Sequence, residues 1–451
     1  MENTDIIAAI ATPPGRGGIG VVRVSGKNLQ SLAQRIIGYV PQARHASLSK
    51  FLDKNGCAID QGIVLYFPSP HSYTGEDVLE LQGHGGPAVM NLLLSCCISA
   101  GARLAQPGEF TLRAFLNSKL DLAQAESVAD IIDASTTEAA RCAMRSLQGD
   151  FSAAIHMLVQ ALTDLRMVVE AVLDFPEEET GFLQEADVYS QLKTIQERLE
   201  RVRLSARQGS LLREGMHVVL VGQPNVGKST LMNRLVGQDV SIVTEIPGTT
   251  RDAIRQAIEI EGIPLYVIDT AGLHETNDAV EKIGIARTRS AIAKADLVLL
   301  VMDSRLGVAP MDRIILDSLP AELPVIYVHN KTDLLDEFSR VTNEEGQREI
   351  YLSAKTGAGM EQLRAKLLEV VGWQSTSVGE GIFMARHRHL LALTEAGAHL
   401  DNATGLAERA TQLELLAEEL RLAQRSLSSI TGEFSADDLL GRIFSSFCIG
   451  K

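Results

Sequence analysis

Residues 222–229, GQPNVGKS, match the phosphate-loop pattern G-x-x-x-x-G-K-[ST], in which a short loop binds nucleotide phosphates. They follow an apolar run, HVVLV, and precede a helix-compatible segment, TLMNRLV, which is the strand–loop–helix setting that the motif requires. Glycines allow backbone N–H groups to close around phosphate oxygens, and the helix N-terminus adds positive partial charge. In this setting Lys228 can reach the β- and γ-phosphates, and the Ser229 hydroxyl can ligate Mg²⁺.

Three further motifs follow downstream, and together with the phosphate loop they point to a guanine nucleotide. DTAG, at 269–272, follows an apolar run, so that its aspartate can hold the Mg²⁺ shell while a glycine amide meets the γ-phosphate. NKTD, at 330–333, follows another apolar run. The carboxylate of its aspartate can accept hydrogen bonds from both N1–H and the exocyclic amine of guanine, a donor pair that adenine lacks. SAK, at 353–355, supports the base, and four motifs in this order predict GTP rather than ATP. The motif residues assigned to the nucleotide are Asn225, Val226, Gly227, Lys228, Ser229, Thr230, Asp269, Thr270, Ala271, Gly272, Asn330, Lys331, Asp333, Ser353, Ala354 and Lys355.

Two groups that a Ras-like GTPase uses are missing from these motifs. The residue after DTAG is Leu273, where a Ras-like enzyme carries the glutamine that orients the attacking water, and an apolar side chain cannot polarise water. No arginine is obviously placed to neutralise the transition state, a charge worth about 10³–10⁵ in rate, or roughly 4–7 kcal/mol. Asn225 lies inside the phosphate loop, where its amide oxygen can hold a monovalent cation beside the β- and γ-phosphates. A bound cation is therefore expected to supply the missing charge.

The chain has 451 residues, which is too long for one core and predicts about two to four domains. The first part is predicted to be α+β, with strands at 19–24 and 62–67 and a helix at 87–100. Helical periodicity then fills 120–173 and 187–208 and returns at 386–447, on both sides of a doubly wound α/β block. This order predicts a Ras-like P-loop GTPase domain inserted into one all-α helical domain. The expected domain limits are 1–118, 119–214 and 215–375, followed by 376–451 for the second part of the helical domain.

The composition restricts partners and location. A formal net charge of −15 argues against a protein that coats nucleic acid nonspecifically. The N-terminal segment MENTDIIAAI lacks a basic region followed by a long apolar run, and the most apolar stretch, 89–102, is too short for a membrane span. Five cysteines without C-x-x-C spacing favour reduced thiols over a disulfide framework or a zinc site. His84, which lies among glycines, is expected to be structural rather than a metal ligand. These features predict a cytoplasmic protein with no membrane contact.

The sequence resembles the MnmE (TrmE) family of tRNA modification GTPases over essentially its whole length. The GTPase motifs alone fit many relatives, whereas the N-terminal segments together with the C-terminal ending are specific to this family. The segments that carry the resemblance are ATPPGRGGIGVVRVSG, SYTGEDVLELQGHGG, PGEFTLRAFLNSKLDLAQAE, PNVGKS, IPGTTRD and the final FCIGK.

The resemblance implies ion sites around the phosphates. Members of the family bind K⁺ through the phosphate-loop asparagine and through backbone carbonyls of a loop before GTT, which match Asn225, Thr244, Ile246 and Thr249. Thr250 then matches the switch threonine that ligates Mg²⁺ beside Ser229, and Glu245, Pro247 and Gly248 belong to the same GTP-binding loop. The water-orienting glutamate of the family matches Glu281 in AVEKIG, and Glu275 is the nearer competitor. On the sequence alone, Glu281 is an ordinary exposed helix residue.

The resemblance also implies a folate site in an N-terminal domain that pairs two subunits. The family's contacts to a tetrahydrofolate derivative, in its 5-formyl or methylene form, match Arg23, Glu80 and Lys119, with the terminal Lys451 nearby. Cys448 matches the family's C-terminal ending and is a candidate functional thiol, although a small buried residue at a chain end is an equally good interpretation.

The implied function is that of a potassium-activated GTPase acting with an FAD-dependent, MnmG/GidA-like partner in a heterotetramer. The pair adds a carboxymethylaminomethyl or aminomethyl group at carbon 5 of the wobble uridine of certain tRNAs, reaching tRNA mainly through the complex. FAD belongs to the partner, and the GTPase domains of a homodimer are expected to pair in the GTP and K⁺ state. The alternative is a ribosome-assembly GTPase of the same superfamily, and a dynamin-like protein is disfavoured because no membrane-facing basic or apolar patch is evident. The choice between glycine and ammonium as nitrogen donor stays open.

Overall fold

The structure of the protein is a computed structural model, and its contacts divide the chain into two units. One unit contains Met1–Ala129, Ile155–Gln160 and Gln424–Lys451, and the other contains Asp130–Ala154 and Ala161–Ala423. The structure describes residues 5–174, 187–236, 255–269, 292, 295–317, 319–320, 323–335, 340–342, 348–373, 381–409, 412–433, 437–445, 447 and 450.

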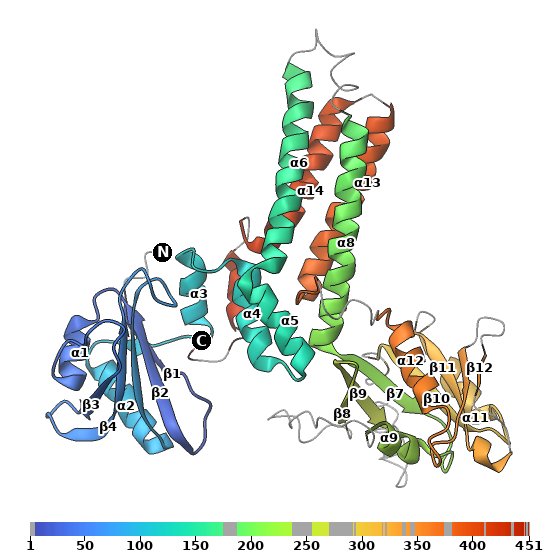
Figure 1. The fold of residues 1–451 in the computed structure, drawn as a ribbon, viewed down its shortest axis with the longest axis horizontal. Coiled ribbons are helices and arrows are strands. Elements are labelled where there is room, and N and C mark those ends of the chain that lie inside the picture. The colour runs from blue at the N-terminus through green and yellow to red at the C-terminus, as the bar shows by residue number, and fades with distance from the viewer. Residues whose placement is uncertain are drawn as a thin grey trace. The chain divides into compact units, whose positions relative to one another are not determined.

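The first unit is built on a six-stranded sheet with the order β3-β4-β5-β2-β1-β6, antiparallel except where β1 meets β6. Its elements are β1 (Ile7–Ile10), β2 (Gly17–Gly26), α1 (Gln30–Ile37), β3 (Ser47–Leu52), β4 (Ala58–Phe67), β5 (Asp77–Gly85), α2 (Pro87–Ser99), β6 (Arg103–Leu104) and α3 (Glu109–Leu116). Because side chains alternate along a strand, Val22 and Val24 join the core under α1 and α2, whereas Arg23 lies on the opposite face. The predicted α+β fold is confirmed, with the two expected strands inside β2 and β4 and the expected helix in α2 (Figure 1).

A network of charges, buried at Arg113, Glu76 and Glu109, holds α3 to the start of this sheet. The Arg113 guanidinium donates to Glu76 Oε2 at 2.9 Å, to Glu109 Oε1 at 3.0 Å and to Asp5 Oδ1 at 2.9 Å. Arg103 adds two further bonds to the Glu109 carboxylate. Burial alone would raise the pKa of Glu109, but the hydrogen bonds from Arg103, the backbone and Arg113 lower that pKa below its ordinary value of 4.5. The Glu109 carboxyl is therefore ionised, and its charge is paired with those of Arg103 and Arg113.

The helical part contains more breaks than the periodicity predicted. Residues 120–173 form three helices instead of one continuous run: α4 (Leu122–Asp133), α5 (Thr137–Gln148) and α6 (Asp150–Asp174). The Thr136 hydroxyl accepts from the N–H of Ala139 and begins α5, and Gly149, at φ 101°, ends it in the left-handed conformation. The other helices are α8 (Val188–Glu214), α13 (His387–Arg409), α14 (Leu413–Thr431) and α15 (Asp437–Ser445).

The helices α8 and α13 run side by side (Figure 1), and a hydrogen bond of 2.8 Å joins Gln196 on α8 to Asp401 on α13. The helix α8 continues six residues past the predicted end at 208, until Gly215 ends it at φ 70°. Among the helices in the described ranges, none has the length and apolar character needed to cross a lipid bilayer.

The second sheet, in the second unit, has seven strands in the order β12-β13-β11-β10-β7-β9-β8. Neighbours from β13 to β9 are parallel, and the edge strands β8 and β12 are antiparallel. Its elements are β7 (Met216–Val221), α9 (Lys228–Val236), β8 (Arg255–Ile260), β9 (Ile263–Asp269), β10 (Leu297–Asp303), α11 (Pro310–Asp317), β11 (Val325–Asn330), the short 3₁₀ helix η3 (Thr332–Leu334), β12 (Arg340–Thr342), β13 (Arg348–Tyr351) and α12 (Met360–Val370). The predicted doubly wound α/β block is confirmed, and its four apolar runs are β7, β9, β10 and β11.

One face of this second sheet shares a core with the helical segment. Ala139, Cys142 and Ala143 of α5 pack in one cluster with residues of β7, β8 and β9. The Thr136 hydroxyl donates to the carbonyl of Gly262, in the turn between β8 and β9, at 2.8 Å. The hairpin that carries β8 and β9 is thus anchored to the N-terminus of α5.

Candidate nucleotide-binding site

The phosphate loop follows β7, the strand at which the order of the parallel sheet reverses direction. This is the topological switch point where α/β sheets bind ligands. Gly222 adopts φ 143°, and a Cβ there would lie 2.1 Å from the carbonyl oxygen of Val301 on β10. Gly227 adopts φ 100°, and a Cβ there would lie 2.3 Å from Asn330 Nδ2. Both glycines are therefore required by their conformation and by a close neighbour, which is backbone at Gly222 and the Asn330 side chain at Gly227.

The loop presents the predicted phosphate and cation ligands at the start of α9. Lys228 is buried at the first position of this helix, and its Nζ donates to the carbonyls of Gly222 and Gln223 at 2.6 and 2.9 Å. Ser229 is exposed in the first helical turn, so its hydroxyl is accessible to a metal ion. Asn225 is exposed in the loop at φ 62°, a left-handed conformation that asparagine tolerates better than most residues.

Asn330 joins three of the predicted motifs. Its side chain is buried, its Nδ2 donates to the carbonyl of Val226 in the phosphate loop at 2.8 Å, and its Oδ1 accepts from the N–H of Ala354 in SAK at 2.9 Å. Asp333 lies three residues later, and its Oδ1 accepts from the Ser353 hydroxyl at 2.6 Å. The structure thus brings the phosphate loop, NKTD and SAK to one edge of the sheet, with the Asp333 carboxylate oriented by SAK.

Several predicted residues of this site lie outside the described residues. These are Thr244, Glu245, Ile246, Pro247, Gly248, Thr249, Thr250, Thr270, Ala271, Gly272, Glu281 and, at the C-terminus, Cys448 and Lys451. The backbone of Asp269 is described: it ends β9 directly opposite Leu220 of β7. The chain therefore reaches the start of DTAG beside the strand that leads into the phosphate loop.

Sequence reasoning missed one charged residue of this edge, Asp303. It ends β10, pairs in register with Asn330 of β11, and accepts from Lys331 Nζ at 2.9 Å. Hydrogen bonds from Arg305 and Lys331 hold the pKa of the Asp303 carboxyl far below its ordinary value, so it is a carboxylate. The only sequence signal was an acidic residue that ends an apolar run, VLLVM, and an isolated acid at a strand end does not point to a function.

Two of the predicted folate residues, Arg23 and Glu80, lie on the face of the first sheet opposite α1 and α2. Arg23 and Glu80 are direct neighbours on β2 and β5, and Arg23 Nε donates to Glu80 Oε1 at 2.9 Å. The Arg23 guanidinium also lies 5.7 Å from the ring centroid of Tyr73 and 5.9 Å from that of Phe110. Lys119 is exposed, and its stem lies against Gly75, two residues from Tyr73. The loop from Tyr73 to Gly75 therefore contacts both predicted cations.

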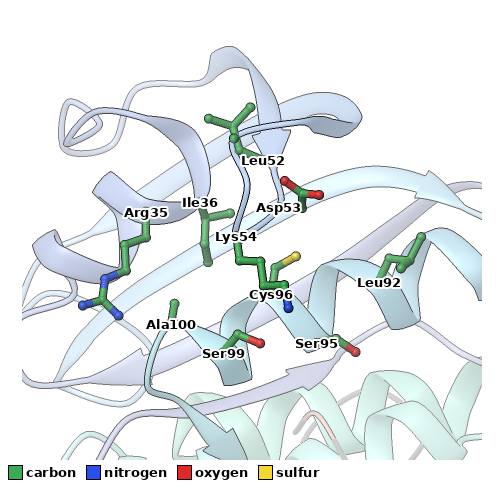
Figure 2. Close-up of a pocket in the computed structure, with 11 residues that line it drawn as sticks. Arg35, Ile36, Leu52, Asp53, Lys54, Leu92, Ser95, Cys96, Ser99 and Ala100 are labelled. Atoms are coloured by element: carbon green, nitrogen blue, oxygen red, sulfur yellow. The ribbon is translucent and has the colours of Figure 1, made fainter.

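A separate groove of about 670 Å³ lies on the helix-covered face of the same sheet, between α1, α2 and the turn after β3 (Figure 2). Its described lining includes Arg35, Lys54 and Cys96 but not Arg23, Glu80 or Lys119. Burial, reinforced by the nearby charge of Asp53, raises the pKa of the Cys96 thiol. The groove therefore offers two cations but no activated thiolate.

A doubly wound sheet with a phosphate loop at its switch point, joined through Asn330 to the NKTD and SAK motifs, defines a P-loop GTPase. A family model described as "MnmE helical domain" matches residues 122–448, and one described as "GTP-binding protein TrmE N-terminus" matches residues 6–119. The tRNA modification GTPase MnmE of Nitrosospira multiformis is 68% identical over 453 residues, covering 100% of both chains. The same-named protein of Thiobacillus denitrificans is 59% identical over 447 residues, covering 99% of this chain and 98% of the relative. The chain belongs to the MnmE family of tRNA modification GTPases.

Similar solved structures include Era of Aquifex aeolicus bound to GDP.AlF4-. It is 28% identical and covers 40% of this chain and 65% of that chain, with a TM-score of 0.28, which is too low to support an argument. Family membership therefore rests on the two family models and the full-length relatives.

Proposed function

We propose that this chain is a potassium-activated GTPase that acts with an FAD-dependent, MnmG/GidA-like partner on carbon 5 of the wobble uridine of certain tRNAs. A tetrahydrofolate derivative supplies the one-carbon unit, and GTP hydrolysis drives conformational change rather than the carbon chemistry. The observation that carries the GTPase part is the Asn330 side chain, which ties the phosphate loop to the base-binding motifs at 2.8 and 2.9 Å. Membership of the MnmE family supports the tRNA part, and the complex is expected in the cytoplasm.

The residues present fit the two cations that the proposal requires. Ser229 is exposed at the first turn of α9, and the backbone of Asp269 ends the neighbouring strand β9. The chain thus supplies beside the loop a serine and an aspartate, two residue types whose oxygens Mg²⁺ prefers. Asn225 offers an exposed amide oxygen in the loop itself. A bound K⁺ supplies the positive charge that an arginine supplies in other GTPases. The carbonyls of Thr244, Ile246 and Thr249 are proposed to complete its cage, and Glu281 is proposed to orient water in place of the missing glutamine.

The cation is tested by GTP hydrolysis in K⁺ and in Na⁺ at equal ionic strength. The wild type is expected to be much faster in K⁺, Asn225→Ala to lose that difference, and Glu281→Ala to stay slow in both salts. Asn233→Ala, an exposed asparagine on α9 next to the loop, is the matched control and should retain the K⁺ preference. Equal wild-type rates in the two salts would overturn the potassium role.

The folate site is proposed on the face of the first sheet opposite α1 and α2, around Arg23, Glu80 and Lys119, with Lys451 and the Cys448 thiol contributed by the C-terminus. Arg23 is suited to an anionic or carbonyl group because Glu80 and the two aromatic rings hold its guanidinium in place. Homodimerisation is proposed through the same N-terminal domain, and pairing of the GTPase domains is proposed for the GTP and K⁺ state.

Calorimetry of the full chain with 5-formyl-tetrahydrofolate tests this site. Arg23→Ala and Lys119→Ala should each weaken binding, whereas Arg35→Ala and Lys54→Ala should bind like the wild type, because these cations line the groove on the helix-covered face. The reverse pattern would move the folate to the groove of Figure 2.

A further inference from the structure

Asp303 occupies an unusual position at the end of β10. Its side chain is only 4% exposed, and it is surrounded by donors: Arg305 Nε and a terminal nitrogen of the same guanidinium, at 2.9 and 2.7 Å, the N–H of Arg305 at 3.1 Å, and Lys331 Nζ at 2.9 Å. One buried carboxylate thus binds two cations from two different segments. The first cation, Arg305, belongs to the loop after β10, and the second, Lys331, belongs to NKTD.

The same strand end also binds the main chain of NKTD. The Ser304 N–H and hydroxyl both donate to the carbonyl of Asn330, each at 2.9 Å. The next residue, Lys331, then turns into a left-handed conformation at φ 69°, which costs free energy for a residue with a side chain and persists only where neighbours hold it. Asp333 follows inside η3. The direction of the Asp333 side chain therefore depends on a turn at Lys331 that Asp303 and Ser304 hold from β10.

We propose that Asp303 is a positioning residue for guanine recognition, acting through Lys331. Asp303 binds the Lys331 ammonium and so fixes the turn between Asn330 and Asp333. The inference rests on the proposed assignment of Asp333 to guanine. It goes beyond that assignment because Asp303 belongs to none of the nucleotide-binding motifs.

The two partners of Asp303 differ in a way that makes the proposal testable. Lys331 is 28% exposed and belongs to the guanine-binding motif, whereas Arg305 is 48% exposed and belongs to no motif. Loss of the carboxylate would leave two unneutralised cations beside each other, and Lys331 would turn toward water. Loss of the Arg305 side chain would leave the bond between Asp303 and Lys331 in place. Nucleotide binding should therefore weaken when the bond between Asp303 and Lys331 is lost, and should stay the same when only the Arg305 side chain is removed.

The experiment is steady-state GTP hydrolysis by the full chain, with the fold of each variant checked by the fluorescence of its single tryptophan, Trp373. Asp303→Ala is expected to raise KM for GTP by about tenfold or more with kcat within about twofold, because the lost bond involves charged groups and lies away from the phosphates. Arg305→Ala should leave KM within about twofold of wild type. A wild-type KM in folded Asp303→Ala would overturn the proposal.

A double-mutant cycle separates positioning from a general packing role. Lys331→Met removes the ammonium but keeps most of the stem, and in that background Asp303→Ala should add less than about twofold to KM. Full additivity would overturn the route through Lys331. Asp333→Asn distinguishes a failure of the positioning role from a failure of the guanine assignment. If this variant does not shift its preference toward xanthosine triphosphate, the assignment of NKTD to guanine is wrong. If it does shift while Asp303→Ala keeps a wild-type KM, only the positioning role falls.

Discussion

Asn330→Ala is the substitution whose effect can be worked out most directly from the structure. The Asn330 side chain is 2% exposed and makes two hydrogen bonds to buried main chain, donating to the Val226 carbonyl and accepting from the Ala354 N–H. Truncation leaves both backbone groups without these partners. A buried polar group left unpaired costs about 1–3 kcal/mol, so the free energy of unfolding of the GTPase region should fall by roughly 2–6 kcal/mol. That is a large fraction of the roughly 5–15 kcal/mol that stabilises an ordinary domain.

Urea denaturation followed by tryptophan fluorescence measures this change. Trp373 is the single tryptophan, and its side chain packs in the core that the second sheet shares with α5 and α12, so its emission reports the unfolding of this region. Asn233→Ala, an exposed asparagine on α9, should stay within about 0.5 kcal/mol of wild type. GDP affinity should fall in Asn330→Ala as well, because the phosphate loop loses its hydrogen bond to the segment that is proposed to bind the base. An Asn330→Ala variant within about 0.5 kcal/mol of wild type would show that these two hydrogen bonds do not stabilise the region.

Three further substitutions test other parts of the fold. Thr136→Val removes both the helix cap of α5 and the bond to the turn between β8 and β9, and should lower the free energy of unfolding by about 1–2 kcal/mol, measured by the same fluorescence titration. Gly222→Ala places a Cβ 2.1 Å from the Val301 oxygen and should weaken GDP binding by about tenfold or more in a fluorescent-nucleotide titration, whereas Gly307→Ala, also at positive φ but in open space, should bind GDP normally. Because the folded pKa of Glu109 is lowered, its ionised form stabilises the N-terminal domain above the ordinary pKa of 4.5, and this stability is lost as the pH falls through the folded pKa. Glu109→Gln should therefore flatten the fall in unfolding free energy between about pH 5 and pH 3, measured by circular dichroism in urea, and a slope like that of the wild type would contradict this.

The nucleotide site was predictable because its chemistry is local in the sequence. Each motif directly follows an apolar run, and the parallel sheet brings the carboxyl ends of β7 and β11 to one edge. The role of Asp303 was not predictable, because it depends on the strand register that places Asp303 beside Asn330. No local sequence pattern encodes that register.

The breaks between helices and part of the first sheet could not be predicted from the sequence, for a different reason. A single residue decides each helix break: a capping hydroxyl at Thr136 and a left-handed glycine at Gly149. The run LELQGHGG resembles a turn, yet most of it forms β5, because glycines there permit close approach of β2: a Cβ on Gly85 would lie 2.7 Å from the Gly17 carbonyl oxygen. In that strand the Nδ1 atom of His84 lies 2.7 Å from Asp60 Oδ1.

The central claim, that this chain couples GTP hydrolysis to tRNA modification, is tested most directly by nucleoside analysis of tRNA. A strain that lacks the chain would be complemented with the wild type, with Lys228→Ala, or with the control Asn233→Ala, each expressed to the same level. Modification at carbon 5 of the wobble uridine should disappear in the deletion strain, return with the wild type and the control, and stay absent with Lys228→Ala, because this lysine belongs to the phosphate loop. Unchanged modification in the deletion strain, or full restoration by a Lys228→Ala protein that hydrolyses no GTP, would contradict the claim.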